Sequence, residues 1–138
     1  MTAPYGGIDI NQGDLFWIDI PPSHVEGSEQ HGRRPFVVMS RLMINRRVNT
    51  VVAVPLTTYE DQTKFQSWVA KQSPFRIVIP VAEITRDIGC ASQLYNCVAK
   101  TDQVRVVDKS RLEQKIGRLS QTATLSIGLG LAYIFDIR

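Results

Sequence analysis

The sequence contains little cysteine and no long apolar run. Only two of its 138 residues are cysteines, Cys90 and Cys97. Their spacing is neither that of a CxxC redox pair nor that of a four-ligand metal set, so we expect free thiols. No segment approaches the roughly 18 apolar residues of a membrane span, and the first residues lack the features of a signal peptide. We therefore expect a cytoplasmic protein that does not enter a membrane.

The motifs of several enzyme classes are also missing. The sequence has no HExxH or EF-hand pattern, no Walker or dinucleotide glycine spacing, and no G-x-S-x-G turn. These absences argue against metal-dependent hydrolysis, nucleotide-dependent chemistry and a serine hydrolase, and we expect neither a metal nor a cofactor. Two histidines, His24 and His31, flank one polar loop. They leave open an acid–base pair for RNA cleavage, although solvated loop residues are the commoner case.

Positive charge is absent from the first thirty residues. That segment holds five of the 13 acidic residues and no lysine or arginine, so all 16 basic residues follow it, against eight acidic ones. Five arginines lie within fifteen residues that contain no acid: Arg33, Arg34, Arg41, Arg46 and Arg47. This density suits a polyanion such as RNA, although a solvated basic face would show the same pattern.

The length and the hydrophobic fraction of 43% are those of one ordinary globular domain over residues 1–138. Residues 1–12 show no sustained period, and we expect a loose tail there. The polar stretches 23–33 and 58–73 are expected to be loops, and 84–96 fits no single pattern. β-branched and aromatic residues predict strands at 15–20, 35–40, 50–56, 75–79, 97–100 and 104–107. The second and third of these strands are expected to pair antiparallel.

The end of the chain changes to a helical period. Asp108 is placed to cap a short helix through Ile116, with Gly117 behind it, and Ser120 to cap a second helix to about Phe135. Apolar residues surround much of the axis of the second helix, so we expect cover on more than one side, which dimerisation could supply. These elements predict a mainly β fold, a small barrel or compact sheet with C-terminal helices.

One loop and the strand after it carry the most specific pattern. Residues 27–35 read GSEQHGRRP and are followed at once by FVVMS. VPLTT at 54–58, PFRI at 74–77, DQVRVVDK at 102–109 and GRLS at 117–120 follow in order. Together these blocks resemble the PemK/MazF family of toxin endoribonucleases. Agreement of several ordered blocks is far stronger than a match to one motif.

The resemblance implies an SH3-like β-barrel of the PemK, MazF and CcdB kind. Such proteins are usually homodimers that cut single-stranded RNA at short sequences without a metal ion. RNA carries its own nucleophile, the 2′-hydroxyl, so the enzyme need only align it with the adjacent phosphate and stabilise the developing charge. The implied products are a 2′,3′-cyclic phosphate and a 5′-hydroxyl end. The implied partner is a MazE-like antitoxin whose acidic, partly disordered tail folds over the basic groove.

The same resemblance assigns roles to individual residues. Arg34, the arginine before the proline, offers a planar fork of donors to phosphate oxygens, and Thr57 can donate its hydroxyl to the same phosphate. Glu29 could accept the 2′-hydroxyl proton or hold Arg34 in place. Lys100 and Asp102 are the second choice as catalytic residues. The residues expected to contact bases or phosphates are Ser28, Gln30, Arg33, Thr58, Lys100, Asp102, Gln103 and Arg105.

Other readings stay open at this point. From its type alone Thr57 is an ordinary strand threonine and Arg34 a surface charge. A non-catalytic gyrase poison of the CcdB kind shares the barrel but lacks this arginine–threonine pair, and an inactive RNA-binding module would show salt-dependent binding without products. The head before Gly13 and the stretches 59–72 and 84–95 are longer than the family norm. These stretches could change which RNA is cut or how the antitoxin docks.

Overall fold

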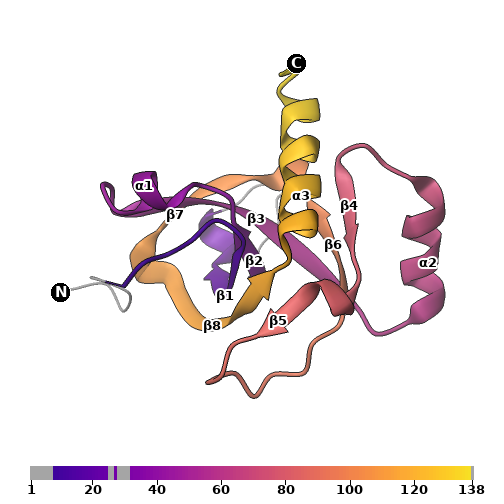
Figure 1. The fold of residues 1–138 in the computed structure, drawn as a ribbon, viewed down its shortest axis with the longest axis horizontal. Helices are drawn as coiled ribbons and strands as arrows, with labels where there is room; N and C mark the ends of the chain where they lie inside the picture. The colour runs from indigo at the N-terminus through magenta and orange to yellow at the C-terminus, as the bar shows by residue number, and fades with distance from the viewer. Residues whose placement is uncertain (1–7, 25–26, 28–31, 138) are drawn as a thin grey trace.

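A computed structural model describes residues 8–24, 27 and 32–137. Within them, antiparallel strands form one sheet that curls into a half barrel, and a helix near the C-terminus stands against it (Figure 1). The strands are β1 Asp14–Ile20, β2 Gly32–Val38, β3 Thr50–Tyr59, β4 Arg76–Ile79, β5 Ile84–Arg86, β6 Asn96–Lys100, β7 Arg105–Asp108 and β8 Leu112–Leu119. The helices are α1 Leu42–Asn45, α2 Gln62–Lys71 and α3 Gln121–Ile134.

The strands lie in the order β4-β6-β3-β2-β1-β8-β5, and β7 also pairs with β3. All six strands predicted from the sequence are present. The antiparallel pairing of β2 with β3 is confirmed, with Phe36 opposite Pro55 and Val38 opposite Ala53. None of the helices in the described residues has both the length and the apolar character needed to cross a membrane.

The partners of β3 change along its length, and this change shapes the site. The first half of β3 pairs with β7 up to Ala53, and its second half pairs with β6 from Leu56 onward. β6 and β7 are consecutive in the chain, and the 3₁₀ turn Thr101–Gln103 lies between them. Leu56 pairs with Ala99 and Ala53 pairs with Arg105, so an advance of three residues along β3 corresponds to six residues from β6 to β7. The turn between β6 and β7 therefore bulges out of the ladder opposite Pro55. Proline has no N–H to donate, so it tolerates the interruption.

The curled sheet buries an apolar cluster on each face. Along β1 the side chains alternate, so Phe16 and Ile18 enter one cluster while Leu15 enters the other. α3 covers the second cluster with Ile127. Both cysteines are buried and free, as predicted. Burial raises the pKa of the Cys97 thiol to about 12, which leaves it protonated and unreactive at neutral pH.

The first predicted C-terminal helix is wrong, because this segment forms β8. Asp108 does accept a hydrogen bond from Ser110 N at 2.9 Å, but it caps only the 3₁₀ turn Lys109–Arg111. β8 then pairs with β1 and β5, and this non-local pairing overrides the local helix signal. Gly117 is not a helix stop: a Cβ there would lie 2.1 Å from the carbonyl oxygen of Thr85.

The second predicted helix is confirmed as α3, because Ser120 accepts a hydrogen bond from Ala123 N at 3.0 Å. The loop predicted at 58–73 instead contains α2. Asp61 caps α2 by accepting from Thr63 N at 2.8 Å, and Phe65 is buried. The expectation of a loose tail is also wrong for residues 8–12, since Ile10 is only 2% exposed.

Candidate functional site

Three polar side chains, Arg34, Thr57 and Arg105, lie at the ends of strands on the face of the sheet that buries Phe36 and Val107, the inner face. Side chains alternate along a strand, so Arg34 follows the buried Phe36 on β2, and Thr57 follows Pro55 on β3. Arg105 precedes the buried Val107 on β7 and pairs with Ala53. The inner face of the curled sheet therefore changes from apolar to polar at one end, which we call the barrel mouth.

Arg34 and Thr57 lie on adjacent strands at the barrel mouth. The β2–β3 ladder ends at Phe36 and Pro55, so Arg34 and Thr57 each lie two residues beyond its last pair and on the same face of the sheet. Arg34 is half-buried, and this burial lowers the pKa of its guanidinium, which nevertheless stays charged. Thr57 Oγ1 is buried and makes no hydrogen bond to any described residue. A buried hydroxyl in this condition costs free energy, so its presence indicates a role toward a ligand.

Lys100 adds a further cation at the barrel mouth. It ends β6 and pairs with Arg76 of β4 across the ladder. Burial lowers the pKa of the Lys100 ammonium, the charges of Arg76 and Arg34 lower it further, and Asp102 opposes them. Lys100 therefore feels both guanidinium groups, and these side chains form one cationic cluster around the middle of β3. Such a cluster attracts a phosphate.

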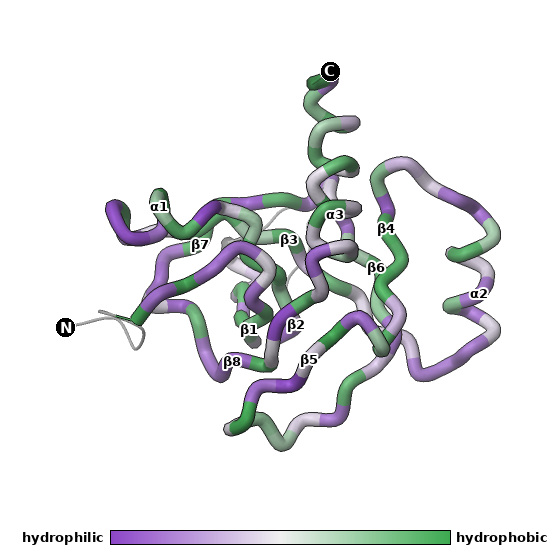
Figure 2. Tube along the Cα trace, in the orientation of Figure 1, coloured by the Kyte–Doolittle hydropathy of each residue, from purple (hydrophilic) through white to green (hydrophobic). Residues whose placement is uncertain are grey.

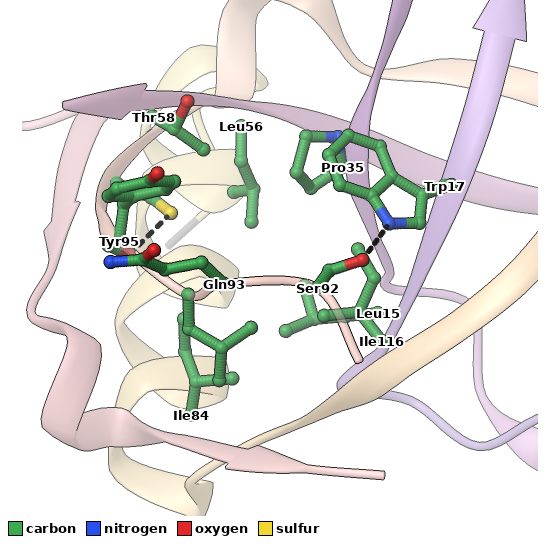
Figure 3. Close-up of a pocket in the computed structure, with 12 residues that line it drawn as sticks. Leu15, Trp17, Pro35, Leu56, Thr58, Ile84, Ser92, Gln93, Tyr95 and Ile116 are labelled. Atoms are coloured by element: carbon green, nitrogen blue, oxygen red, sulfur yellow. Dashed lines mark hydrogen bonds between the residues drawn. The ribbon is translucent and has the colours of Figure 1, made fainter. Parts of the chain in front are cut away.

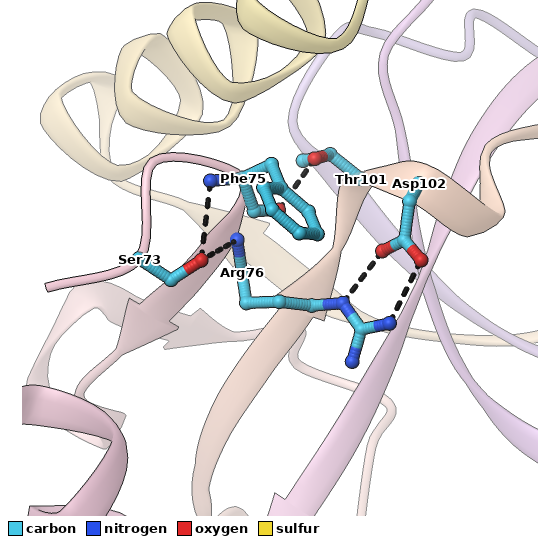
Figure 4. A network of polar contacts seen from close by, with 5 residues as sticks. All are labelled: Ser73, Phe75, Arg76, Thr101 and Asp102. Carbon is cyan, nitrogen blue, oxygen red and sulfur yellow. Dashed lines mark hydrogen bonds and ion pairs between the residues drawn. The ribbon is translucent and has the colours of Figure 1, made fainter. Parts of the chain in front are cut away.

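An ion pair holds the bulged turn in place. Arg76 donates two hydrogen bonds to the Asp102 carboxylate, at 2.6 and 2.7 Å (Figure 4). The Arg76 hydrogen bond is the main reason that the pKa of Asp102 is lowered, and a hydrogen bond from the Gln103 side chain adds to it. Thr101 Oγ1 donates to the carbonyl oxygen of Phe75. These contacts fix the turn Thr101–Gln103 beside Lys100.

The Arg76–Asp102 pair gives a prediction about stability against pH. The pKa of Asp102 is lowered in the folded protein. The ionised carboxylate therefore contributes its full stabilisation above the ordinary pKa of 3.8, and this stabilisation is lost as pH falls through the lowered pKa. At pH 7 we expect Asp102→Asn to lower the free energy of unfolding by about 1 kcal/mol. Urea unfolding at pH 7 and pH 3 should show this difference shrinking at the lower pH. An equal difference at both values would contradict the prediction.

The sheet divides the predicted site residues into two groups. Arg33 lies on the other face of β2 from Arg34: its guanidinium covers the ring of Trp17 at 4.3 Å and pairs with Glu113 at 2.8 Å. Thr58 likewise lies on the other face of β3 from Thr57 and lines an apolar cavity with Trp17. The structure therefore does not bring Arg33 and Thr58 together with the cationic cluster.

Some of the remaining predicted site residues lie at the barrel mouth, and the others lie outside the residues that the structure describes. Lys100, Asp102, Gln103 and Arg105 follow one another through β6, the bulged turn and β7. Arg105 Nε is buried and makes no hydrogen bond to a described residue. Three predicted site residues and one loop histidine lie outside the described residues: Ser28, Glu29, Gln30 and His31. Among the described residues, no three of histidine, cysteine, aspartate and glutamate are grouped to hold a metal ion.

Arg76 is the site residue that sequence reasoning missed. It stands inside the PFRI block, which indicates only a strand. Nothing in its immediate sequence distinguishes it from a solvated strand arginine. Its role follows from the register that sets it opposite Lys100 and from the position of Asp102, 26 residues later in the chain.

The curled antiparallel sheet and the C-terminal helix define a small half-barrel fold with a cationic mouth. Residues 11–135 match the family described as PemK-like, MazF-like toxin of type II toxin-antitoxin system. The chain belongs to this family.

Several characterised proteins are similar to this chain. The endoribonuclease toxin MazF of Escherichia coli strain K12 is 33% identical over 97 residues, which are 70% of this chain and 67% of that protein. Endoribonuclease MazF of Staphylococcus epidermidis is 29% identical over 88% of this chain and 92% of its own length. The crystal structure of MazF from Deinococcus radiodurans superposes with a TM-score of 0.66 at 22% identity, covering 93% and 97% of the two chains. This superposition confirms the predicted mainly β barrel fold.

Proposed function

We propose that the chain is an endoribonuclease that cleaves single-stranded RNA by attack of a 2′-hydroxyl on the adjacent phosphate. The observation that carries the proposal is the buried Thr57 hydroxyl, which is unsatisfied among the described residues and lies on the same face of the sheet as Arg34, just beyond the end of the β2–β3 ladder. Two relatives, from Escherichia coli and Staphylococcus epidermidis, are named endoribonucleases, which supports the same reading.

Each group at the barrel mouth has a defined part in the proposed reaction. The planar guanidinium of Arg34 donates to the non-bridging oxygens of the reacting phosphate, and the Thr57 hydroxyl donates to the same phosphate. As O2′ bonds to phosphorus and the bond to O5′ breaks, negative charge grows on these oxygens. Donors that are already in place stabilise this charge more than the charge of the ground state.

Two proton transfers complete the reaction. Glu29, which lies outside the described residues, is proposed from the sequence resemblance to accept the proton of the 2′-hydroxyl. Lys100 is the donor that we assign to the leaving O5′, because burial and two neighbouring cations lower its pKa and so make it a stronger acid than an ordinary lysine. Asp102 serves this step indirectly, by its ion pair with Arg76. The products are a 2′,3′-cyclic phosphate and a 5′-hydroxyl end, and no metal takes part.

A labelled RNA incubated with the purified protein in EDTA tests the proposal. We expect cleavage by the wild-type protein and none by the double variant Arg34→Ala, Thr57→Ala. RNA that stays intact with the wild-type protein, or is cut by the double variant, would contradict the proposed function.

The proposed partner is an antitoxin with an acidic segment that covers the cationic cluster. One structure of similar fold is that of an endoribonuclease in complex with its cognate antitoxin, from Mycobacterial species, with a TM-score of 0.62 at 19% identity. A crystal structure from Deinococcus radiodurans is that of MazE–MazF. The cluster of Arg34, Arg76 and Lys100 has the charge that attracts such a segment.

We also propose a homodimer that buries the outer face of α3. The outer part of this helix projects beyond the sheet and is largely hydrophobic (Figures 1 and 2). Leu125, Leu129 and Tyr133 are each at least 60% exposed, which is unusual for a stable monomer surface. Sedimentation should show a dimer at micromolar concentration, and Leu129→Glu should shift it to a monomer. The variant Gln66→Glu, at an exposed polar position of α2 away from this face, is the control. A wild-type monomer would contradict this prediction.

A further inference from the structure

A cavity of about 260 Å³ lies where β2 and β3 separate (Figure 3). Trp17 of β1, Pro35 of β2 and Thr58 of β3 form one side of it, and the segment 92–95 forms the other. The segment belongs to the stretch 84–95 that the sequence marks as longer than the family norm. The cavity is therefore formed in part by this stretch.

Hydrogen bonds hold the cavity wall in place. Arg86 donates to the carbonyl oxygen of Ser92 at 2.6 Å, and Gln114 Nε2 donates to the carbonyl oxygen of Gly89 at 2.9 Å. Trp17 Nε1 donates to Ser92 Oγ at 3.3 Å across the cavity wall (Figure 3). The segment 92–95 is thus tied to β5 and β1, Gly89 before it is tied to β8, and the cavity is preformed.

The lining suits a flat ring with polar edges. Trp17 and Tyr95 supply aromatic surface, and the Arg33 guanidinium lies over the Trp17 ring at 4.3 Å. The Gln93 amide and the Thr58 hydroxyl are exposed and make no hydrogen bond to another described residue. An amide offers a donor and an acceptor side by side, as the edge of a base requires. Because a cavity of roughly 150 Å³ accepts benzene, one of this size has room for a nucleobase.

The cavity also lies next to the barrel mouth. Pro35 follows Arg34 directly in β2, and Thr58 follows Thr57 directly in β3, so the two sites occupy opposite faces of the same pair of strands. The β2–β3 ladder has ended at this level, and the strands no longer close the sheet. A nucleotide whose phosphate contacts Arg34 therefore reaches the cavity on the other face with its base, at the level where the two strands no longer pair.

We propose that this cavity binds one nucleobase of the RNA adjacent to the reacting phosphate, and that Gln93 reads that base. The inference rests on the proposed endoribonuclease function and adds a specificity determinant to it. Arginines at both faces of β2 favour a polyanion over an apolar peptide as the occupant. An apolar side chain of the antitoxin is the competing occupant, and the experiments below separate the two.

Mapping the cleavage sites on a long RNA by primer extension tests the role of Gln93. We expect Gln93→Ala to cut the wild-type sites roughly 10-fold more slowly and to relax the base preference at one position next to the cut. Gln66→Ala, an exposed change on α2, is the matched control and should keep the wild-type pattern. Identical patterns for both variants would overturn the inference, whereas a wild-type protein that cuts no RNA would overturn the proposed function instead.

Fluorescence supplies a readout that does not depend on cleavage. The chain has two tryptophans, so Trp68→Phe leaves Trp17 as the only one. A short RNA with a 2′-deoxy sugar at the cut site should quench Trp17 in this variant, and Gln93→Ala should weaken the binding. Quenching that is absent with saturating RNA would overturn the inference. So would Gln93→Ala weakening only the binding of an antitoxin peptide.

Discussion

Replacing Arg34 by alanine is expected to slow RNA cleavage by roughly 100- to 1000-fold, the loss typical of removing one preorganised donor from a developing charge. Arg34 is half-buried at the end of the inner face of β2, and its position is fixed by pairing with Ile18 of β1. The expected loss falls mainly on kcat, because the charge on the phosphate oxygens grows only in the transition state. Single-turnover cleavage of a short labelled RNA measures it.

Two companion variants make the Arg34 result specific. Arg34→Lys keeps the charge but loses the planar fork, so we expect it to recover only a small part of the activity. Lys64→Ala removes an exposed charge on α2 and should cleave at the wild-type rate. If Arg34→Lys were fully active, or if Lys64→Ala lost as much as Arg34→Ala, the assignment of Arg34 to the reacting phosphate would be wrong.

Replacing Thr57 by valine is expected to separate stability from activity. Valine has nearly the same shape but no hydroxyl, so cleavage should fall roughly 100-fold. Because Thr57 Oγ1 is buried and unsatisfied among the described residues, the same change should raise the free energy of unfolding by about 1 kcal/mol. Urea unfolding and single-turnover cleavage of the same preparation give both values.

The role of Thr57 is tested by whether Thr57→Val slows cleavage and at the same time raises the free energy of unfolding. Thr85→Val changes an exposed threonine of β5 and should alter neither value appreciably. A Thr57→Val protein that is less stable than the wild type would mean that the hydroxyl has a structural partner. A variant with full activity would remove Thr57 from the reaction.

Much of the barrel could be predicted from local pattern. β1, β3 and the second half of β2 contain runs of β-branched and aromatic residues that are buried as the pattern requires, whereas the first residues of β2 lie in the stretch 23–33, where the sequence predicts a loop. α3 follows from its Ser120 cap and its apolar period. For these elements, propensity, burial and capping all favour the same structure.

The rest depends on contacts between distant residues. β8 has a helix-like local sequence, but pairing with β1 and β5 decides its conformation. Arg33 and Arg34 look equivalent in the sequence, yet alternation places them on opposite faces of β2. The role of Arg76 in the cationic cluster and in holding the bulged turn follows only from its pairing with Lys100 and its ion pair with Asp102. A single sequence without its pairing register does not contain these relations.

The chemical nature of the cut ends tests the central claim most directly. A defined RNA is incubated with the purified wild-type protein in EDTA, and the ends of both fragments are identified by mass spectrometry. Attack by the 2′-hydroxyl predicts a 2′,3′-cyclic phosphate on one fragment and a 5′-hydroxyl on the other, with neither fragment formed by Arg34→Ala within the same time. Fragments with a 3′-hydroxyl and a 5′-phosphate would show that water is the nucleophile and would contradict the account.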